Sequence, residues 1–258
     1  MNNKDEWNTS IFTDSKIINQ LKSHTDIFKN YRDWPSISEY EKIFKQLEME
    51  VKPVHQSFNI DNFESQYEPR VYLKKELQTR TSNWHDFFNA LIWLKFRKTK
   101  KTLNTLHYDE AILRNKGTNR STLENRITQF DECGAIVVSN DNNLLELIRN
   151  HEWEELFINH REQFGTSMEC IIFGHAIFEK ALNPYIGMTC HCILLEDDDI
   201  LKEIKQDNME SLDSYLAELW ANQIRFNPAK FHPLPILGIP GYWKSQNTEF
   251  YKNKKYFR

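Results

Sequence analysis

The side chains best suited to chemistry are concentrated in three short segments, and the first is "NWHDFFN", residues 83–89. A helix here would place His85, Asp86 and Asn89 on one side, because they are spaced three or four residues apart. Imidazole, carboxylate and amide groups bind divalent metal ions or transfer protons. An acid in the first turn also stabilises a helix, so a purely structural role for Asp86 stays open.

The second segment is "FDECG", residues 130–134, in which two acids directly precede an apolar run. Asp131 and Glu132 would stand at the C-terminal end of a helix, where the helix dipole disfavours negative charge. Some positive group must therefore compensate them. Arg126, another basic side chain and a metal ion are all candidates.

The third segment is "FGHAIFEK", residues 173–180, which follows another apolar run. It places His175 and Glu179 one helical turn apart. Such a pair either shares a metal ion or forms a weak ion pair, and the spacing alone does not separate the two.

These segments could form one site if the strands at 134–140 and 168–173 are antiparallel neighbours, because Asp131 and Glu132 enter one strand and His175 leaves the other. Such a site would hold a divalent ion that activates water and polarises a phosphoryl or acyl oxygen. Without metal, the same groups would perform general acid–base catalysis. The predicted metal ligands are His85, Asp86, Asp131 and His175. The predicted catalytic residues are Glu132 and Glu179, either of which could be the general base, and Asn89.

A basic run follows the first segment and consists of Lys95, Arg97, Lys98, Lys100 and Lys101. We predict that it contacts the phosphate of a substrate. A solvated helix face is the plainer interpretation of such a run, and nucleic-acid binding is a third one.

The elements expected to position these residues are helices followed by short buried strands. Helices are predicted over residues 36–51 and 83–96, and over 121–132, where Ser121 and Glu124 form a capping box. Residues 52–70 are predicted to be an extended connector because they contain two prolines.

The pattern then changes to short continuous apolar runs at residues 134–140, 168–173 and 189–195, as in buried strands. We predict a mostly helical α+β fold around a small sheet of about three strands, in a single domain covering residues 1–258. Residues 1–35 are expected to be peripheral, and residues 228–258 are expected to form an extended C-terminal arm.

Composition and missing motifs exclude several classes of protein. The net charge of −4 gives no general attraction to nucleic acid or membranes. No apolar run approaches the ~20 residues of a membrane span, and we expect a cytoplasmic protein. The sequence has no P-loop, no G-x-S-x-G elbow and no H-E-x-x-H helix.

Several blocks resemble a proteobacterial family known as domain of unknown function 3025. They are "NWHDFFNALIW", "FDECGAIVV", "FGHAIFEKAL" and the closing "LPILGIPGYW". The resemblance runs from about residue 65 to the C-terminus and includes all three polar segments. It implies a bacterial protein but no activity.

The first hypothesis is therefore a metal-dependent hydrolase that acts on a phosphate-bearing small molecule. The alternatives are a non-catalytic binding protein, in which a buried histidine–carboxylate network holds the core together, and nucleic-acid binding through residues 95–101.

Overall fold

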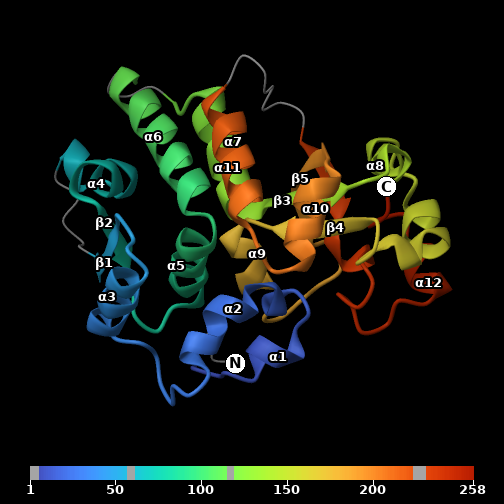
Figure 1. Ribbon diagram of the computed structural model, residues 1–258, viewed down its shortest axis with the longest axis horizontal. Helices are drawn as coiled ribbons and strands as arrows, with labels where there is room; N and C mark the ends of the chain where they lie inside the picture. The colour runs from blue at the N-terminus through green and yellow to red at the C-terminus, as the bar shows by residue number, and fades with distance from the viewer. Residues whose placement is uncertain (1–5, 57–61, 115–118, 223–230) are drawn as a thin grey trace.

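The computed structural model describes residues 6–56, 62–114, 119–222 and 231–258, which form a mixed α+β fold (Figure 1). One hydrophobic core runs through it. The helices are α1 (Ile11–Asp14), α2 (Lys22–Thr25), α3 (Ile37–Gln46), α4 (Tyr67–Lys74), α5 (Trp84–Lys95), α6 (Arg97–Leu113), α7 (Thr122–Cys133), α8 (Asn142–Arg149), α9 (His175–Lys180), α10 (Asp198–Lys205), α11 (Glu210–Ala221) and α12 (Thr248–Tyr251). None of the described helices is both long enough and apolar enough to cross a membrane.

The main sheet has the strand order β4-β3-β5-β6, where β3 is parallel to β5 and the other pairs are antiparallel. Its strands are β3 (Gly134–Ser139), β4 (Met168–Ile172), β5 (Thr189–Glu196) and β6 (His232–Pro235). The three strands predicted from apolar runs are confirmed. The fourth strand, β6, comes from the C-terminal arm.

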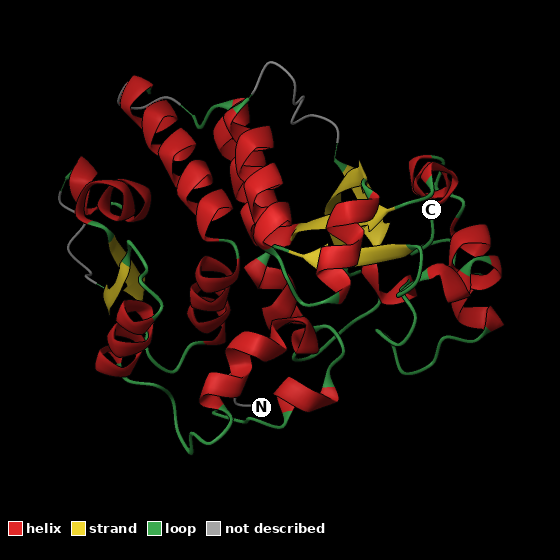
Figure 2. Cartoon of the chain, in the orientation of Figure 1, coloured by secondary structure: helices red, strands yellow, loops and turns green. Residues whose placement is uncertain are grey.

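A second, two-stranded sheet lies on the opposite side of α5 and α6 from the main sheet (Figure 2). Its parallel strands are β1 (Lys52–His55) and β2 (Glu76–Thr79), and α4 lies between them in the chain. The prediction of an extended connector over residues 52–70 is wrong, because this segment contains strand β1 and the start of helix α4. Pro69 lies in the first turn of α4, where a missing backbone N–H breaks no helical hydrogen bond.

Helix α5 is buried on almost every side because α2, α6 and α9 all pack against it. The Asn83 side chain caps it by accepting a hydrogen bond from the Asp86 backbone N–H (3.0 Å). The chain bends at Phe96, and α6 starts anew. Asp213 of α11 caps that start by accepting from the backbone N–H groups of Lys98 (2.9 Å) and Thr99 (2.8 Å).

Both ends of the described chain contribute to the core. Residues 1–35 were expected to be peripheral, yet Phe12, Ile18 and Leu21 are buried. At the other end, Tyr256 and Phe257 are buried as well. The core therefore includes side chains from the whole length of the described sequence.

Candidate functional site

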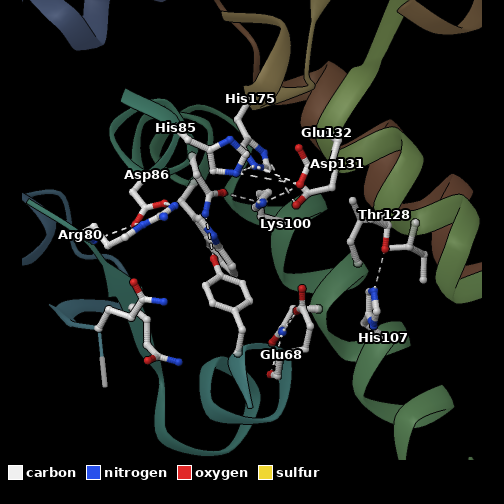
Figure 3. Close-up of a pocket in the computed structure, with 18 of the residues that line it drawn as sticks. Glu68, Arg80, His85, Asp86, Lys100, His107, Thr128, Asp131, Glu132 and His175 are labelled. Carbon is white, nitrogen blue, oxygen red and sulfur yellow. Dashed lines mark hydrogen bonds and ion pairs between the residues drawn. The ribbon is translucent and has the colours of Figure 1, made fainter. Parts of the chain in front are cut away.

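The three polar segments of the sequence meet at a cavity of about 300 Å³. Residues of β2, α4, α5, α6, α7 and α9 line it, so that helices from both halves of the chain form its wall (Figure 3). Strands β3 and β4 are antiparallel neighbours, as a shared site requires.

Two histidines face each other at one end of this cavity. His85 lies in the first turn of α5 and His175 is the first residue of α9, and these two helices pack together. Their Nε2 atoms are 3.0 Å apart (Figure 3). Two imidazole nitrogens can approach so closely only when a proton or another cation lies between their lone pairs.

Glu132 in the last turn of α7 completes this cluster. Its Oε1 lies 3.7 Å from His175 Nε2 and 4.0 Å from His85 Nε2. The chain brings α7 and α9 together because the Gly134 carbonyl accepts from the backbone N–H groups of Phe173 (3.0 Å) and Gly174 (2.8 Å). A Cβ on Gly174 would lie only 2.5 Å from the Glu132 carbonyl oxygen, so this approach requires glycine.

Each histidine has a carboxylate on its far side. Glu179 Oε2 is 2.9 Å from His85 Nδ1, and Asp131 Oδ2 is 3.9 Å from His175 Nδ1. His175 Nδ1 is buried and has no hydrogen-bond partner among the described residues. Both carboxylates favour a proton on Nδ1, which would leave an acceptor lone pair on each Nε2.

Lys100 of α6 compensates the charge of Asp131. Its Nζ donates to Asp131 Oδ1 (2.6 Å) and to Asn89 Oδ1 (3.0 Å), and Asn89 Nδ2 donates to the Tyr67 hydroxyl (2.8 Å). Burial would raise the pKa of Asp131, but the Lys100 ammonium group keeps it below its ordinary value. Arg126, the partner named from the sequence, instead donates to Gln129 Oε1 (2.9 Å).

Burial determines the protonation of the cluster. It lowers the pKa of His175 to about 3, although Asp131 acts in the opposite direction, so this imidazole is neutral at pH 7. Burial also raises the pKa of Glu132, against the influence of His85. A cation placed between the three groups would therefore stabilise the ionised form of Glu132.

Two of the predicted site residues have other partners. Asp86 forms a two-pronged ion pair with Arg80, at 2.9 Å to Nε and 2.8 Å to Nη2, on the cavity wall away from the histidines (Figure 3). Lys95 points into the protein, where it donates to the Gln20 carbonyl (2.7 Å).

The remaining members of the basic run divide between two faces of α6. Lys100 faces the histidine cavity, whereas Arg97, Lys98 and Lys101 line a second cavity. The run is therefore not one continuous cationic surface.

A second polar group, which was not predicted from the sequence, lines the same cavity. Glu68 of α4 accepts a hydrogen bond from Asn104 Nδ2 (2.6 Å), and burial raises the pKa of its carboxyl. His107 lies 3.2 Å from the Thr128 hydroxyl (Figure 3). The sequence did contain a signal for this polar face of α6. Lys100, Asn104 and His107 follow one another at spacings of four and three residues, which places them on one side of a helix.

Comparison with known proteins adds a family but no activity. No curated protein and no protein of solved structure matches the chain. A family described as "Protein of unknown function (DUF3025)" matches residues 52–258, which include every residue of the cavity described above. The chain belongs to this family.

Proposed function

We propose that the protein is a metal-dependent hydrolase that binds a divalent ion through His85, His175 and Glu132. The observation that carries the proposal is the triangle formed by the two Nε2 atoms and Glu132 Oε1, with sides of 3.0, 3.7 and 4.0 Å. The centre of such a triangle is about 2.1 Å from each corner, which is the length of Zn–N and Zn–O bonds.

The surroundings of the triangle support the same assignment. Glu179 and Asp131 stand behind the two histidines, as carboxylates do behind the histidine ligands of many metal sites. Two histidines and one carboxylate also leave a coordination position for water, which is the composition of catalytic rather than structural zinc sites.

This assignment changes some of the roles predicted from the sequence. Glu132 becomes a ligand rather than a general base, while Asp131 and Glu179 orient the histidines. Asn89 positions Lys100, because it accepts a hydrogen bond from the Lys100 ammonium group. Asp86 holds Arg80 in the cavity wall.

A divalent ion at this site would supply a water of lowered pKa and would polarise an oxygen of the substrate. The chain itself must then move protons. Glu68 is suited to this because it lines the cavity and burial raises the pKa of its carboxyl. His107, also in the wall, is the alternative proton carrier.

With a divalent ion bound, the cavity would favour an anionic substrate, and we propose a phosphate-bearing small molecule. Three cations, Arg80, Lys100 and Arg120, line the cavity together with four acids, Glu68, Asp86, Asp131 and Glu132. Arg80 and Lys100 are paired with Asp86 and Asp131. A bound divalent ion would add two positive charges, more than Glu132 neutralises.

The test is metal binding to chelator-treated protein, measured by isothermal titration calorimetry with Zn²⁺ and Mn²⁺. We expect one ion per chain, and we expect His85→Ala, His175→Ala and Glu132→Gln each to weaken binding at least 100-fold. The control is His160→Ala, because His160 also lies near a carboxylate (Glu155, 3.3 Å) but on the surface. The metal-loaded protein should then hydrolyse at least one member of a panel of phosphoesters.

A structural network is the competing interpretation, because one proton shared between the two Nε2 atoms would also explain their distance of 3.0 Å. In that case the wild-type protein would bind no ion, and His175→Ala would lower the unfolding temperature equally with and without chelator. That pair of results would overturn the proposed metal centre.

A further inference from the structure

A second cavity of about 310 Å³ lies beside the first one. It is enclosed by residues 48–51, by the C-terminal part of α4 and by the face of α6 that carries Arg97 and Lys101. Trp93 and Asn104 line both cavities, so these side chains form a shared wall between them.

The lining of this second cavity combines apolar side chains with cations. Met49, Val51 and Val71 provide apolar surface, together with Trp93. Four cations line the same space, against two acids, Glu48 and Glu50. The cations are Lys75, Arg97, Lys98 and Lys101.

Most of the partners of these cations are exposed side chains that a ligand can replace. Lys98 lies 3.3 Å from Glu210, whose side chain is 78% exposed, and donates to the Ser214 hydroxyl (2.9 Å). Lys101 pairs with Glu50 at 2.7 Å, and both side chains are more than half exposed. Arg97 has a long contact of 3.4 Å with the Leu47 carbonyl. Exposed pairs of this kind contribute little stability.

We infer that this second cavity binds a small organic anion that has an apolar body and one anionic head group. The body would contact Val51, Val71 and Trp93, and the head group would bind Arg97 and Lys101. A guanidinium group recognises planar carboxylates and phosphates with two hydrogen bonds. The volume is at the lower end of the range for small-molecule sites.

This site is separate from the proposed metal centre and does not depend on it. Three of the five cations that the sequence presents as one run, Arg97, Lys98 and Lys101, line it. None of the three metal-binding residues does so. The two sites can therefore be tested independently.

The experiment is isothermal titration calorimetry on chelator-treated protein, so that no metal ion at the first cavity binds or hydrolyses a phosphate probe, with four probes that separate the head group from the body. They are 4-phenylbutyrate, its neutral amide, phenyl phosphate and inorganic phosphate. We expect at least one of the two organic anions to bind at least 10-fold more tightly than both the amide and inorganic phosphate. The preferred organic anion identifies the head group as carboxylate or phosphate.

Variants then locate the binding. Arg97→Gln and Lys101→Gln should each weaken binding of the preferred anion about 5- to 10-fold and make it less dependent on salt. Lys22→Gln, which removes an exposed lysine from another ion pair, should leave it unchanged.

Three outcomes would overturn the inference. They are equal binding of the anion and the amide, equal binding of the organic anions and inorganic phosphate, and no binding of any probe. Full binding by both the Arg97→Gln and Lys101→Gln variants would place the ligand elsewhere and also overturn it.

Discussion

Lys100 Nζ lies 2.6 Å from Asp131 Oδ1, and the two side chains are only 5% and 21% exposed. This ion pair stands directly behind His175, whose Nδ1 is 3.9 Å from the second oxygen of Asp131. A residue that the sequence presents as part of a surface charge run thus holds a buried carboxylate in place. The carboxylate that faces His175 Nδ1 is therefore itself held by Lys100.

Replacement of Lys100 by methionine should lower the free energy of unfolding by about 3–5 kcal/mol, because Asp131 would remain buried without its partner. Urea unfolding measures the change. The control, Lys202→Met, removes one partner of the exposed Lys202–Asp198 pair and should hardly shift the midpoint. If Lys100→Met has as small an effect as the control, the pair does not compensate Asp131. The double variant Lys100→Met/Asp131→Asn should recover part of the loss, because no uncompensated charge is left.

Asp131→Asn and Glu179→Gln should each weaken binding of a divalent ion about 10- to 100-fold, because these carboxylates orient the histidine ligands. Calorimetric titration with Zn²⁺ measures the effect. Glu249→Gln is the control, since Glu249 forms only an exposed contact with Lys252. Unchanged affinity in both variants would mean that the carboxylates do not act on the histidines.

Lys95 should make the free energy of unfolding depend on pH in the alkaline range. Burial lowers its pKa to about 8 in the folded protein, whereas an unfolded chain has the ordinary value near 10.5. Between these values the unfolded chain binds more protons, so the contribution of Lys95 to stability rises with pH by about 1.4 kcal/mol per unit.

The Lys95→Met variant isolates this effect from that of other titrating groups. Relative to the variant, the free energy of unfolding of the wild-type protein should rise by about 2 kcal/mol between pH 8 and pH 9.5. Urea unfolding at half-unit steps of pH gives the difference. A difference that stays constant over this interval would show that the pKa of Lys95 is not lowered.

Tyr256→Phe should cost about 1–3 kcal/mol of unfolding free energy. The hydroxyl accepts from the Leu237 backbone N–H (3.0 Å) and donates to the Met188 carbonyl (2.6 Å), and all these groups are buried. Thermal and urea unfolding measure the loss. Tyr185→Phe removes a hydroxyl from a side chain that is 52% exposed and should change little. Equal effects of both variants would show that the C-terminal arm is not anchored by these bonds.

Local patterns predicted the elements on which the site depends. The capping box at Ser121 and Glu124 starts α7 as expected. The apolar runs became β3, β4 and β5, and β3 and β4 pair in the way that brings His175 near Glu132. Short-range periodicity and antiparallel pairing therefore place Glu132 and His175 at one edge of the sheet. They do not place His85, which reaches this edge because α5 packs against α9.

The hydrogen-bond and ion-pair partners of the site residues could not be predicted, because most of them come from distant segments of the chain. Asp86 and Arg80 are close in sequence, but Lys100 reaches Asp131 from 31 positions away and Asn104 reaches Glu68 from 36. Helix α4 was missed since Pro69 suggested a break, and with it Tyr67 and Glu68 were lost from the predicted site. The charge of Lys95 and Lys100 suggested a surface position that the packing of α5 and α6 does not provide.

The absence of a side chain at Gly174 has a further consequence for the cluster of His85, His175 and Glu132. The separation of α7 and α9 is set by main-chain hydrogen bonds to Gly134 and by direct backbone contact. An ion bound at the proposed site would therefore meet preorganised ligands on these two helices, and its affinity would not be reduced by a cost for ordering them. Its rate of entry would be governed by the loss of its own hydration shell rather than by folding of the polypeptide.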